Sequence, residues 1–342
     1  MTPMSNHAID IHTHIVPADF PAYAGKHTSE FGGKQWPQMA AAHDCHHKSV
    51  MIDGKNFRTV TDESWDIERR LEAMARMKIA RQVLSPMPEL LSYWLPLEDA
   101  LPLTRHVNDT IAGMVARAPD KFIGLGGVPM QDPDVAAREL EKLMRDGFKG
   151  IELGSNINGA PLGDPKFDSF FAAAEELGAA IFVHALHPTG KERIIGPPGL
   201  MAYIGFPLET AYCIASLMTG GTLTRHPRLR LAFSHGGGAF ASILPRLTKG
   251  WTIKPEFAER IGVSPYEHAR KLYYDTLVYD GPTLRNLIDL FGVRQLCLGT
   301  DFPFDIHEHH PVDAVASLKL SDGDVKLLHH DNAARFLGDT SL

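Results

Sequence analysis

Hydrophobic and polar positions along the chain form two alternating patterns, short apolar runs of strand length and longer stretches with helical spacing. In the first run the β-branched Ile9 and Ile11 alternate with the polar Asp10 and His12, which is typical of a strand. Eight strands are predicted in all, at residues 9–14, 80–85, 122–128, 149–153, 179–184, 229–234, 271–275 and 295–300. Amphipathic stretches that predict helices lie between them, at residues 65–77, 98–117, 133–146, 166–177, 208–224, 239–250, 264–269 and 281–291.

This alternation favours an α/β fold in which eight parallel strands close into a (β/α)₈ TIM barrel. An open doubly wound sheet is the alternative that the same alternation allows. The barrel is favoured because histidines and a carboxylate follow the strands, at the end where barrel active sites are built. The chain shows no internal repeat, low-complexity tract or linker, so we expect a single barrel domain over residues 1–342.

Two segments interrupt the alternation and predict a distorted barrel. Residues 17–64 separate the first strand from its helix, whereas βα loops usually have about 2–6 residues. The second segment, residues 185–207, is rich in glycine and proline. Because both follow strands, we expect them on the carboxyl-terminal face of the barrel as substrate-binding loops or lids.

Polar side chains recur at the predicted strand ends. His12 and His14 lie two residues apart on one strand, so they share a face at about 7 Å along the chain. Further strands end at His184, His235 and Asp301, and in a barrel all these ends meet at one mouth. Three imidazoles and a carboxylate suit Zn²⁺ or a similar borderline ion. His235 is then left to act as an acid or base near neutral pH.

Composition excludes several classes of protein and partner. Of the 342 residues 44% are hydrophobic, enough for a large core, and the net charge of −7 offers no basic stripe for nucleic acid. Three scattered cysteines imply no disulfide framework and fit a reducing compartment. No apolar window reaches the roughly 18 residues of a membrane span, and the first residues lack a signal-peptide pattern. We therefore expect no membrane association and a cytoplasmic location.

Several motifs together resemble a known family. They are Asp10-Ile11-His12-Thr13-His14, Gly54-Lys55-Asn56-Phe57-Arg58, Phe182-Val183-His184, His235-Gly236-Gly237-Gly238 and Gly299-Thr300-Asp301-Phe302-Pro303-Phe304. With them the chain resembles the amidohydrolase superfamily, in its branch related to 2-amino-3-carboxymuconate-6-semialdehyde decarboxylase. The resemblance extends from residue 8 to Asp331-Asn332-Ala333 near the end of the chain.

The resemblance implies a (β/α)₈ barrel with one divalent metal ion, Zn²⁺ in the first place and Mn²⁺ as the alternative. It assigns His12, His14, His184 and Asp301 as metal ligands. It also places His235 near the metal-bound water. The fourth strand carries Lys149 and Glu152 but no lysine at the ligand-facing end, where a binuclear site with a carboxylated lysine would need one.

The activity implied is nonoxidative decarboxylation of an aromatic carboxylate or a ring-cleavage product. The metal would lower the pKa of a bound water, and His235 would take up or deliver its proton, with Asp301 as a possible shuttle. No G-x-G-x-x-G or P-loop suggests a nucleotide or redox cofactor. A hydrolase of the same branch, acting on a C–C bond, lactone or amide, is the alternative. A non-catalytic metal-binding or scaffold protein is disfavoured by the complete ligand set.

A carboxylate substrate needs a cation, preferably one that binds both oxygens. Arg58 is the first candidate and Lys55 the second, both in the segment after the first strand. In the resembled decarboxylase an arginine at the position of Arg246 reaches the neighbouring subunit's site, which implies a homodimer. After His184 the chain departs from that decarboxylase, which has a tryptophan-bearing stretch there, so His187 and Arg193 become candidate substrate contacts. Other histidines are expected mostly at the surface, namely residues 43, 46, 47, 307, 309, 310, 329 and 330.

Overall fold

The computed structural model describes residues 7–26, 35–197, 199–339 and 341–342. Residues 1–6, on which part of the signal-peptide argument rests, lie outside the described residues. The same holds for residues 27–34 of the first interrupting segment and for Pro198 of the second.

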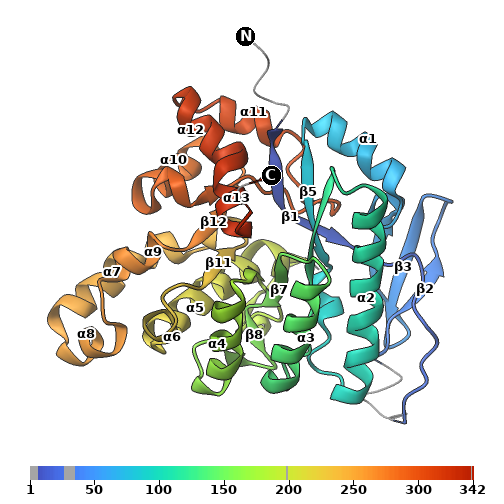
Figure 1. Cartoon of the computed structure of the whole chain (residues 1–342), viewed down its shortest axis with the longest axis horizontal. Coiled ribbons are helices and arrows are strands. Elements are labelled where there is room, and N and C mark those ends of the chain that lie inside the picture. The colour runs from blue at the N-terminus through green and yellow to red at the C-terminus, as the bar shows by residue number, and fades with distance from the viewer. Residues whose placement is uncertain (1–6, 27–34, 198, 340) are drawn as a thin grey trace.

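Eight parallel strands form the barrel that the sequence predicted (Figure 1). In chain order, which is also their order in the sheet, they are β1 (Ile9–Ile15), β5 (Arg81–Pro86), β6 (Phe122–Gly126), β7 (Gly150–Gly154), β10 (Ala180–His184), β11 (Arg230–Phe233), β12 (Tyr273–Asp275) and β13 (Leu296–Cys297). The segment after β13 returns to β1, where Ile11 N donates to Leu298 O at 2.9 Å and His14 N to Phe302 O at 2.7 Å. The sheet therefore closes on itself, and the open doubly wound alternative is wrong.

Helices cover the outside of the barrel where the sequence placed them. They are α1 (Ile67–Met77), α2 (Leu97–Arg117), α3 (Pro133–Arg145), α4 (Asp168–Leu177), α5 (Phe206–Thr219), α7 (Phe240–Ile253), α9 (Pro265–Ala269) and α10 (Gly281–Phe291). Helix α3 illustrates the local cause. The Asp132 side chain accepts from two backbone N–H groups of the first turn, and Ala136, Leu140 and Leu143 form its buried stripe.

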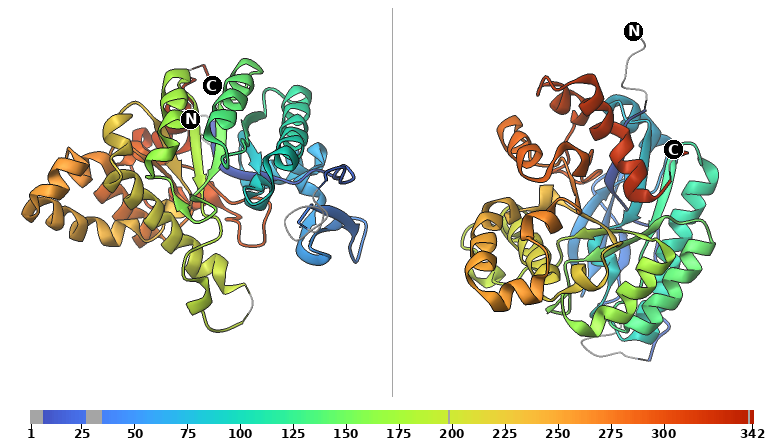
Figure 2. Two further views of the ribbon diagram at one scale, coloured as in Figure 1. Left: turned by 90° about the horizontal axis from the view of Figure 1, so that it is seen from below. Right: turned by 60° about the vertical axis from the view of Figure 1, so that its left-hand side comes forward.

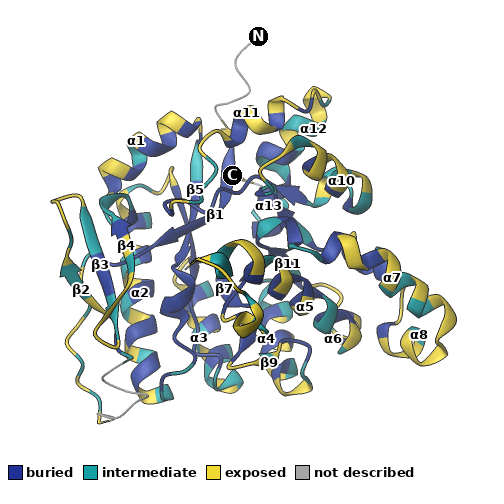
Figure 3. Ribbon diagram, turned by 180° about the vertical axis from the view of Figure 1, so that it is seen from behind, coloured by how far each residue is buried: buried dark blue, intermediate teal, exposed yellow. Residues whose placement is uncertain are grey.

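Other helices were not predicted. The predicted helix at 208–224 is divided at Gly221, which has a φ of 79°, into α5 and α6 (Thr222–Arg225). The sequence analysis also missed α8 (Pro255–Ile261), α11 (Pro311–Ala316), α12 (Asp322–Lys326) and α13 (Asn332–Leu337). Phe336 and Leu337 of α13 pack with Ile9 and Ile11, so this helix completes the core at the amino-terminal end of β1. The strands of the barrel are mostly buried, whereas the surrounding helices have a buried face and an exposed face (Figure 3).

The first interrupting segment folds into an antiparallel sheet of β2 (Gln38–Ala41), β3 (His47–Ile52) and β4 (Lys55–Thr61) at the edge of the molecule (Figure 1). The second segment, residues 185–207, contains short 3₁₀ and π-helical turns at residues 191–193 and 201–205 and projects from the body (Figure 2). Among the described helices, none is both long and apolar enough to cross a membrane.

Candidate metal centre and active site

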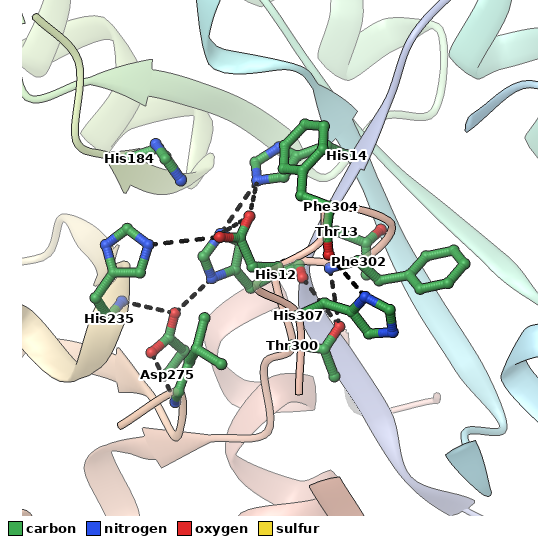
Figure 4. A network of polar contacts seen from close by, with 12 residues as sticks. His12, Thr13, His14, His184, His235, Asp275, Thr300, Phe302, Phe304 and His307 are labelled. Carbon is green, nitrogen blue, oxygen red and sulfur yellow. Dashed lines mark hydrogen bonds and ion pairs between the residues drawn. The ribbon is translucent and has the colours of Figure 1, made fainter. Parts of the chain in front are cut away.

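Strand β1 presents two histidines to the interior of the barrel. His12 and His14 are fully buried, and the Nε2 atoms of their rings lie 3.1 Å apart. Between Asp10 and Thr13 the pairing of β1 with β5 shifts register, which is the mark of a bulge. Because the two residues are two apart on the strand, both imidazoles point toward the same space (Figure 4).

Two other chain segments bring further side chains to this space. His184 ends β10, and Asp301 lies in the segment after β13. One ligand atom each from His12, His14, His184 and Asp301 lies within 4.8 Å of the others. Asp301 Oδ1 is 3.1 Å from His14 Nε2 and 3.5 Å from His12 Nε2. The structure thus brings together the four residues that the sequence analysis expected to meet.

The hydrogen bonds of the imidazoles fix which nitrogen faces the centre. His14 Nδ1 is 3.0 Å from the carbonyl oxygen of Pro86, and His184 Nδ1 is 2.8 Å from that of Ala185. A carbonyl oxygen can only accept, so each Nδ1 carries a hydrogen. The Nε2 atoms are then the ones available to a cation, as in most metal-binding histidines.

Two buried polar atoms at the centre lack a hydrogen-bond partner among the described residues. They are His184 Nε2 and Asp301 Oδ1. An unpaired buried polar group costs about 1–3 kcal/mol. The close Nε2 atoms of His12 and His14 also require a cation between them, either a proton or a metal ion. Three imidazole nitrogens and a carboxylate oxygen fit Zn²⁺ and leave Mn²⁺ possible.

Asp275, at the end of β12, fixes both His12 and the chain at His235. Its Oδ2 lies 2.6 Å from His12 Nδ1 and accepts from His235 N at 2.9 Å, and its Oδ1 accepts from Gly236 N at 2.7 Å (Figure 4). The sequence analysis missed this residue. The available signal was its place at the end of a predicted strand, the same criterion that selected the histidines.

A second carboxylate lies behind His14. Glu152 Oε2 accepts from Ser85 Oγ at 2.5 Å and lies 3.4 Å from His14 Nδ1. Burial lowers the pKa of His14, but Glu152 and Asp301 outweigh it and raise the pKa to about 10. Burial raises the pKa of Asp301, yet the neighbouring His12 and His14 hold it well below its usual range. These carboxylates therefore favour positive charge at the centre.

His235 lies directly beside this group. Its Nε2 is 3.7 Å from Asp301 Oδ2, and its Nδ1 is buried without a hydrogen-bond partner among the described residues. The ring stacks on Phe206 at a centroid distance of 6.3 Å. The glycines after it are required by space, because a Cβ on Gly238 would clash with the carbonyl oxygen of Pro207.

Arg58 on β4 contacts Phe304, an aromatic residue at the edge of the site. Its guanidinium lies 4.1 Å from the centroid of Phe304, and the same ring stacks on His14 at 5.0 Å with an interplanar angle of 18°. Lys55 is the first residue of β4, and its side chain is 83% exposed with its Nζ 3.9 Å from Asp53 Oδ2. Of these two predicted cations, only Arg58 is shown in contact with a residue of the site.

The remaining predicted residues lie further out. Arg246 is exposed on α7, and Arg193 is exposed in the projecting segment. His187 is exposed, and its ring packs against Trp94 at 4.7 Å. His307 does not belong to the ligand group, and its Nδ1 lies 2.7 Å from Phe304 O. His329 is buried, contrary to the expectation for that residue, and neither of its ring nitrogens has a hydrogen-bond partner in the part of the chain that the structure describes.

Behind β1, Arg70 of α1 is fully buried and was not singled out from the sequence. It donates to Thr13 Oγ1 at 2.8 Å, to His14 O at 3.0 Å and to Gln82 Oε1 at 2.8 Å. It therefore holds the segment of β1 that carries the two histidines.

The sequence is similar to known proteins over nearly its whole length. The model of a family described as amidohydrolase matches residues 9–338. A 2-amino-3-carboxymuconate-6-semialdehyde decarboxylase from Dictyostelium discoideum is 37% identical over 335 residues, which are 96% of this chain and 91% of that protein.

Two solved structures share the fold over nearly the whole chain. IDCase from Metarhizium anisopliae in its apo form has a TM-score of 0.82 at 21% identity, with 99% of each chain covered. The 5-carboxyvanillate decarboxylase from Novosphingobium aromaticivorans, complexed with manganese and 4-hydroxy-3-methoxy-5-nitrobenzoic acid, has a TM-score of 0.77 at 21% identity, with 99% of this chain and 97% of that chain covered. This chain belongs to the amidohydrolase family, in the branch related to 2-amino-3-carboxymuconate-6-semialdehyde decarboxylase.

Proposed function

We propose that the protein is a metal-dependent nonoxidative decarboxylase, a carboxy-lyase, that acts on an aromatic carboxylate or a ring-cleavage product. The observation that carries the proposal is the convergence of three imidazole Nε2 atoms and Asp301 Oδ1 on one buried space, with His235 at its side. The Dictyostelium relative is named as a decarboxylase of 2-amino-3-carboxymuconate-6-semialdehyde, and the Novosphingobium neighbour as a decarboxylase of 5-carboxyvanillate.

In this proposal His12, His14, His184 and Asp301 hold a single divalent metal ion. Zn²⁺ is the first candidate because of the three imidazoles, and Mn²⁺ is the second because the Novosphingobium enzyme contains it. Lys149 does not reach this space, since its Nζ pairs with Asp339 at 2.7 Å at the amino-terminal end of the β7 region. That position supports one metal ion rather than a pair bridged by a modified lysine.

A bound metal would supply Lewis-acid chemistry, by lowering the pKa of a water or by polarising a substrate oxygen. His235 is proposed to move the proton, because its Nε2 faces Asp301 Oδ2 and its Nδ1 is free of protein partners in the described residues. Protonation of the carbon that bears the carboxylate makes this carbon tetrahedral. The bond to the carboxylate then breaks, its electron pair returns to the conjugated system, and CO₂ leaves.

Arg58 is proposed to bind the substrate's carboxylate, since its guanidinium is held on Phe304 beside His14. Lys55 and His187 are further candidates on the two segments that we propose act as lids, residues 17–64 and 185–207. One barrel domain over residues 1–342 would contain both segments.

We also propose a homodimer in which Arg246 lies near the partner's site. Exposed apolar side chains support it, because Tyr203, Leu208 and Tyr212 are 61%, 47% and 63% exposed on and beside the projecting segment. The oligomeric state can be measured by sedimentation, and a monomer at micromolar concentration would contradict this part of the proposal. The cytoplasmic location stays a prediction from the sequence.

The experiment that tests the function is incubation with aromatic carboxylates and ring-cleavage acids while CO₂ release is measured. Product that contains incorporated water, without CO₂, would indicate the hydrolase instead. His235→Ala is expected to keep the metal and lose turnover, whereas His330→Ala, a substitution remote from the site, is expected to keep both. Protein purified without chelator should contain metal, and a small fraction of one ion per chain would contradict the site itself.

A further inference from the structure

The turn between β2 and β3 carries a second group of metal-binding side chains, which the proposed function does not use. Its sequence is His43-Asp44-Cys45-His46-His47. One ligand atom each from His43, Asp44 and His47 lies within 4.8 Å of the other two. Among the described residues, this group and the buried one in the barrel are the two places where at least three such side chains meet.

The contacts within this group already place a carboxylate between two imidazoles. Asp44 Oδ1 lies 2.8 Å from His47 Nδ1, and Asp44 Oδ2 lies 3.3 Å from His43 Nε2. The rings of His43 and His47 lie side by side, with centroids 4.5 Å apart and an angle of 31° between their planes. Ligand atoms around a tetrahedral ion with bonds of about 2.0–2.1 Å are about 3.3 Å apart, so small side-chain rotations would complete the geometry.

The backbone of the turn is held by neighbouring elements. His47 begins β3 and pairs with Thr61 of β4. His46 N donates to Asp44 Oδ1 at 2.8 Å, and Asp62 N donates to His46 O at 2.7 Å. The His46 ring is engaged elsewhere, because its Nδ1 lies 2.7 Å from Asp62 Oδ2. This leaves His43, Asp44 and His47 as the three ligands.

Exposure and donor type define the ion that fits. The side chains of His43, Asp44 and His47 are 69%, 41% and 30% exposed, so an ion can enter and water can complete its coordination. Two imidazoles favour borderline transition metals such as Zn²⁺, Ni²⁺ and Cu²⁺ over Mg²⁺ and Ca²⁺, which prefer oxygen ligands. Because these side chains are exposed and flexible, the site should bind more weakly than the buried one.

We propose that His43, Asp44 and His47 form a second, solvent-accessible site for one borderline divalent transition-metal ion. The ion would cross-link the β2–β3 turn of the sheet that also carries Arg58. This site does not depend on the decarboxylase proposal, because it shares no residue with the barrel centre.

The test is calorimetric titration of the holoenzyme with Zn²⁺ after its buried site has been filled. The wild-type protein should bind one further equivalent, and His43→Ala/His47→Ala should lose that equivalent while retaining the buried ion. Asp44→Asn, whose amide oxygen can still accept from His46 N, should weaken the further equivalent at least tenfold. Cys45→Ser is the matched control in the same exposed turn, and it should keep the further equivalent.

Three results would overturn the proposal. They are the absence of a further equivalent in the wild type, its survival in the double variant, and its loss in Cys45→Ser. The thermal unfolding of each variant shows whether it is folded, and metal analysis before the titration shows whether it retains the buried ion.

Discussion

Replacing Arg70 by methionine should destabilise the protein and weaken its metal centre together. The guanidinium is fully buried and makes four hydrogen bonds, with Thr13 Oγ1, His14 O, Gln82 Oε1 and Glu63 O, at 2.8–3.0 Å. Burial lowers the pKa of Arg70 to about 9, so it is charged at neutral pH. A buried polar group that loses its hydrogen-bond partner costs about 1–3 kcal/mol, so the loss of the donor to these four acceptors should lower the free energy of unfolding by about 3–5 kcal/mol.

The metal centre should respond because two of these bonds end on β1, at Thr13 and at the carbonyl group of His14. Without them the part of β1 that carries His12 and His14 has less support. Loss of outer contacts of metal ligands typically reduces metal affinity 10–100-fold. A reduction of this size is expected for Arg70→Met, although Arg70 lies outside the ligand group.

Urea unfolding of the metal-free proteins and competition with a chelator measure the two effects separately. Arg76→Met is the matched control on the same helix. Its guanidinium contacts Glu63 at 2.8 Å but is 64% exposed, so its loss should cost less than about 1 kcal/mol and leave metal affinity unchanged. If Arg70→Met unfolds like Arg76→Met and retains wild-type metal affinity, the positioning role of Arg70 is refuted.

Three further predictions concern the metal, the substrate and pH. Asp275→Asn should reduce metal affinity about 10–100-fold in chelator competition, since the amide replaces the charged acceptor of His12 Nδ1, and an unchanged affinity would contradict its role. Arg58→Met should raise the KM for a carboxylate substrate at least tenfold, with a smaller effect on kcat. Arg69→Met, on the exposed face of α1, should change neither constant. If Arg58→Met has the KM of the wild type, Arg58 does not bind the carboxylate. Burial lowers the pKa of His329, so below its ordinary pKa of about 6.5 the unfolded chain takes up a proton that the folded chain refuses. Stability should therefore fall as pH decreases from 7.5 to 5.5, with at most about 1.4 kcal/mol per pH unit from this group, and urea unfolding of His329→Leu should show a shallower fall; identical slopes would refute the assignment.

The barrel could be predicted because its strands and its site follow from the same local pattern. Each strand is a short apolar run, and the polar residue after it stands at the carboxyl end, as with His184 after Phe182 and Val183. Parallel strands in a closed barrel bring these ends together whatever their separation in sequence. The convergence of His12, His184 and Asp301 therefore needed only the period of the strands and the closure of the sheet.

The partners behind the ligands could not be predicted in this way. Asp275 contacts His12 across 263 residues of sequence, and no periodicity indicates which strand-end carboxylate meets which imidazole. Arg70 looked like a charged position on an amphipathic helix, although its side chain is fully buried. Such pairings depend on the packing of side chains in three dimensions, which a single sequence does not reveal.

The sheet of the first insertion was missed for a different reason. Strand β4 is mostly exposed and polar, so it lacks the apolar alternation on which strand prediction rests. One signal was available, because Asp53-Gly54 between two short runs is typical of a hairpin turn, and both residues adopt positive φ angles of 53° and 68°. That pair would have placed Arg58 on the second strand of a hairpin rather than in a loop.

The placement of Arg58 on a strand matters for its proposed role. Its pairing with Val50 of β3 fixes the backbone from which the side chain reaches Phe304. The Phe304 ring contacts both side chains, with its centroid 4.1 Å from the guanidinium and 5.0 Å from the centroid of the His14 imidazole. The cation proposed to bind the carboxylate and a proposed metal ligand therefore both pack on one aromatic side chain. If Arg58 binds the substrate as proposed, this contact would place the carboxylate beside the proposed metal centre, and substitution of Phe304 should affect both substrate binding and metal affinity.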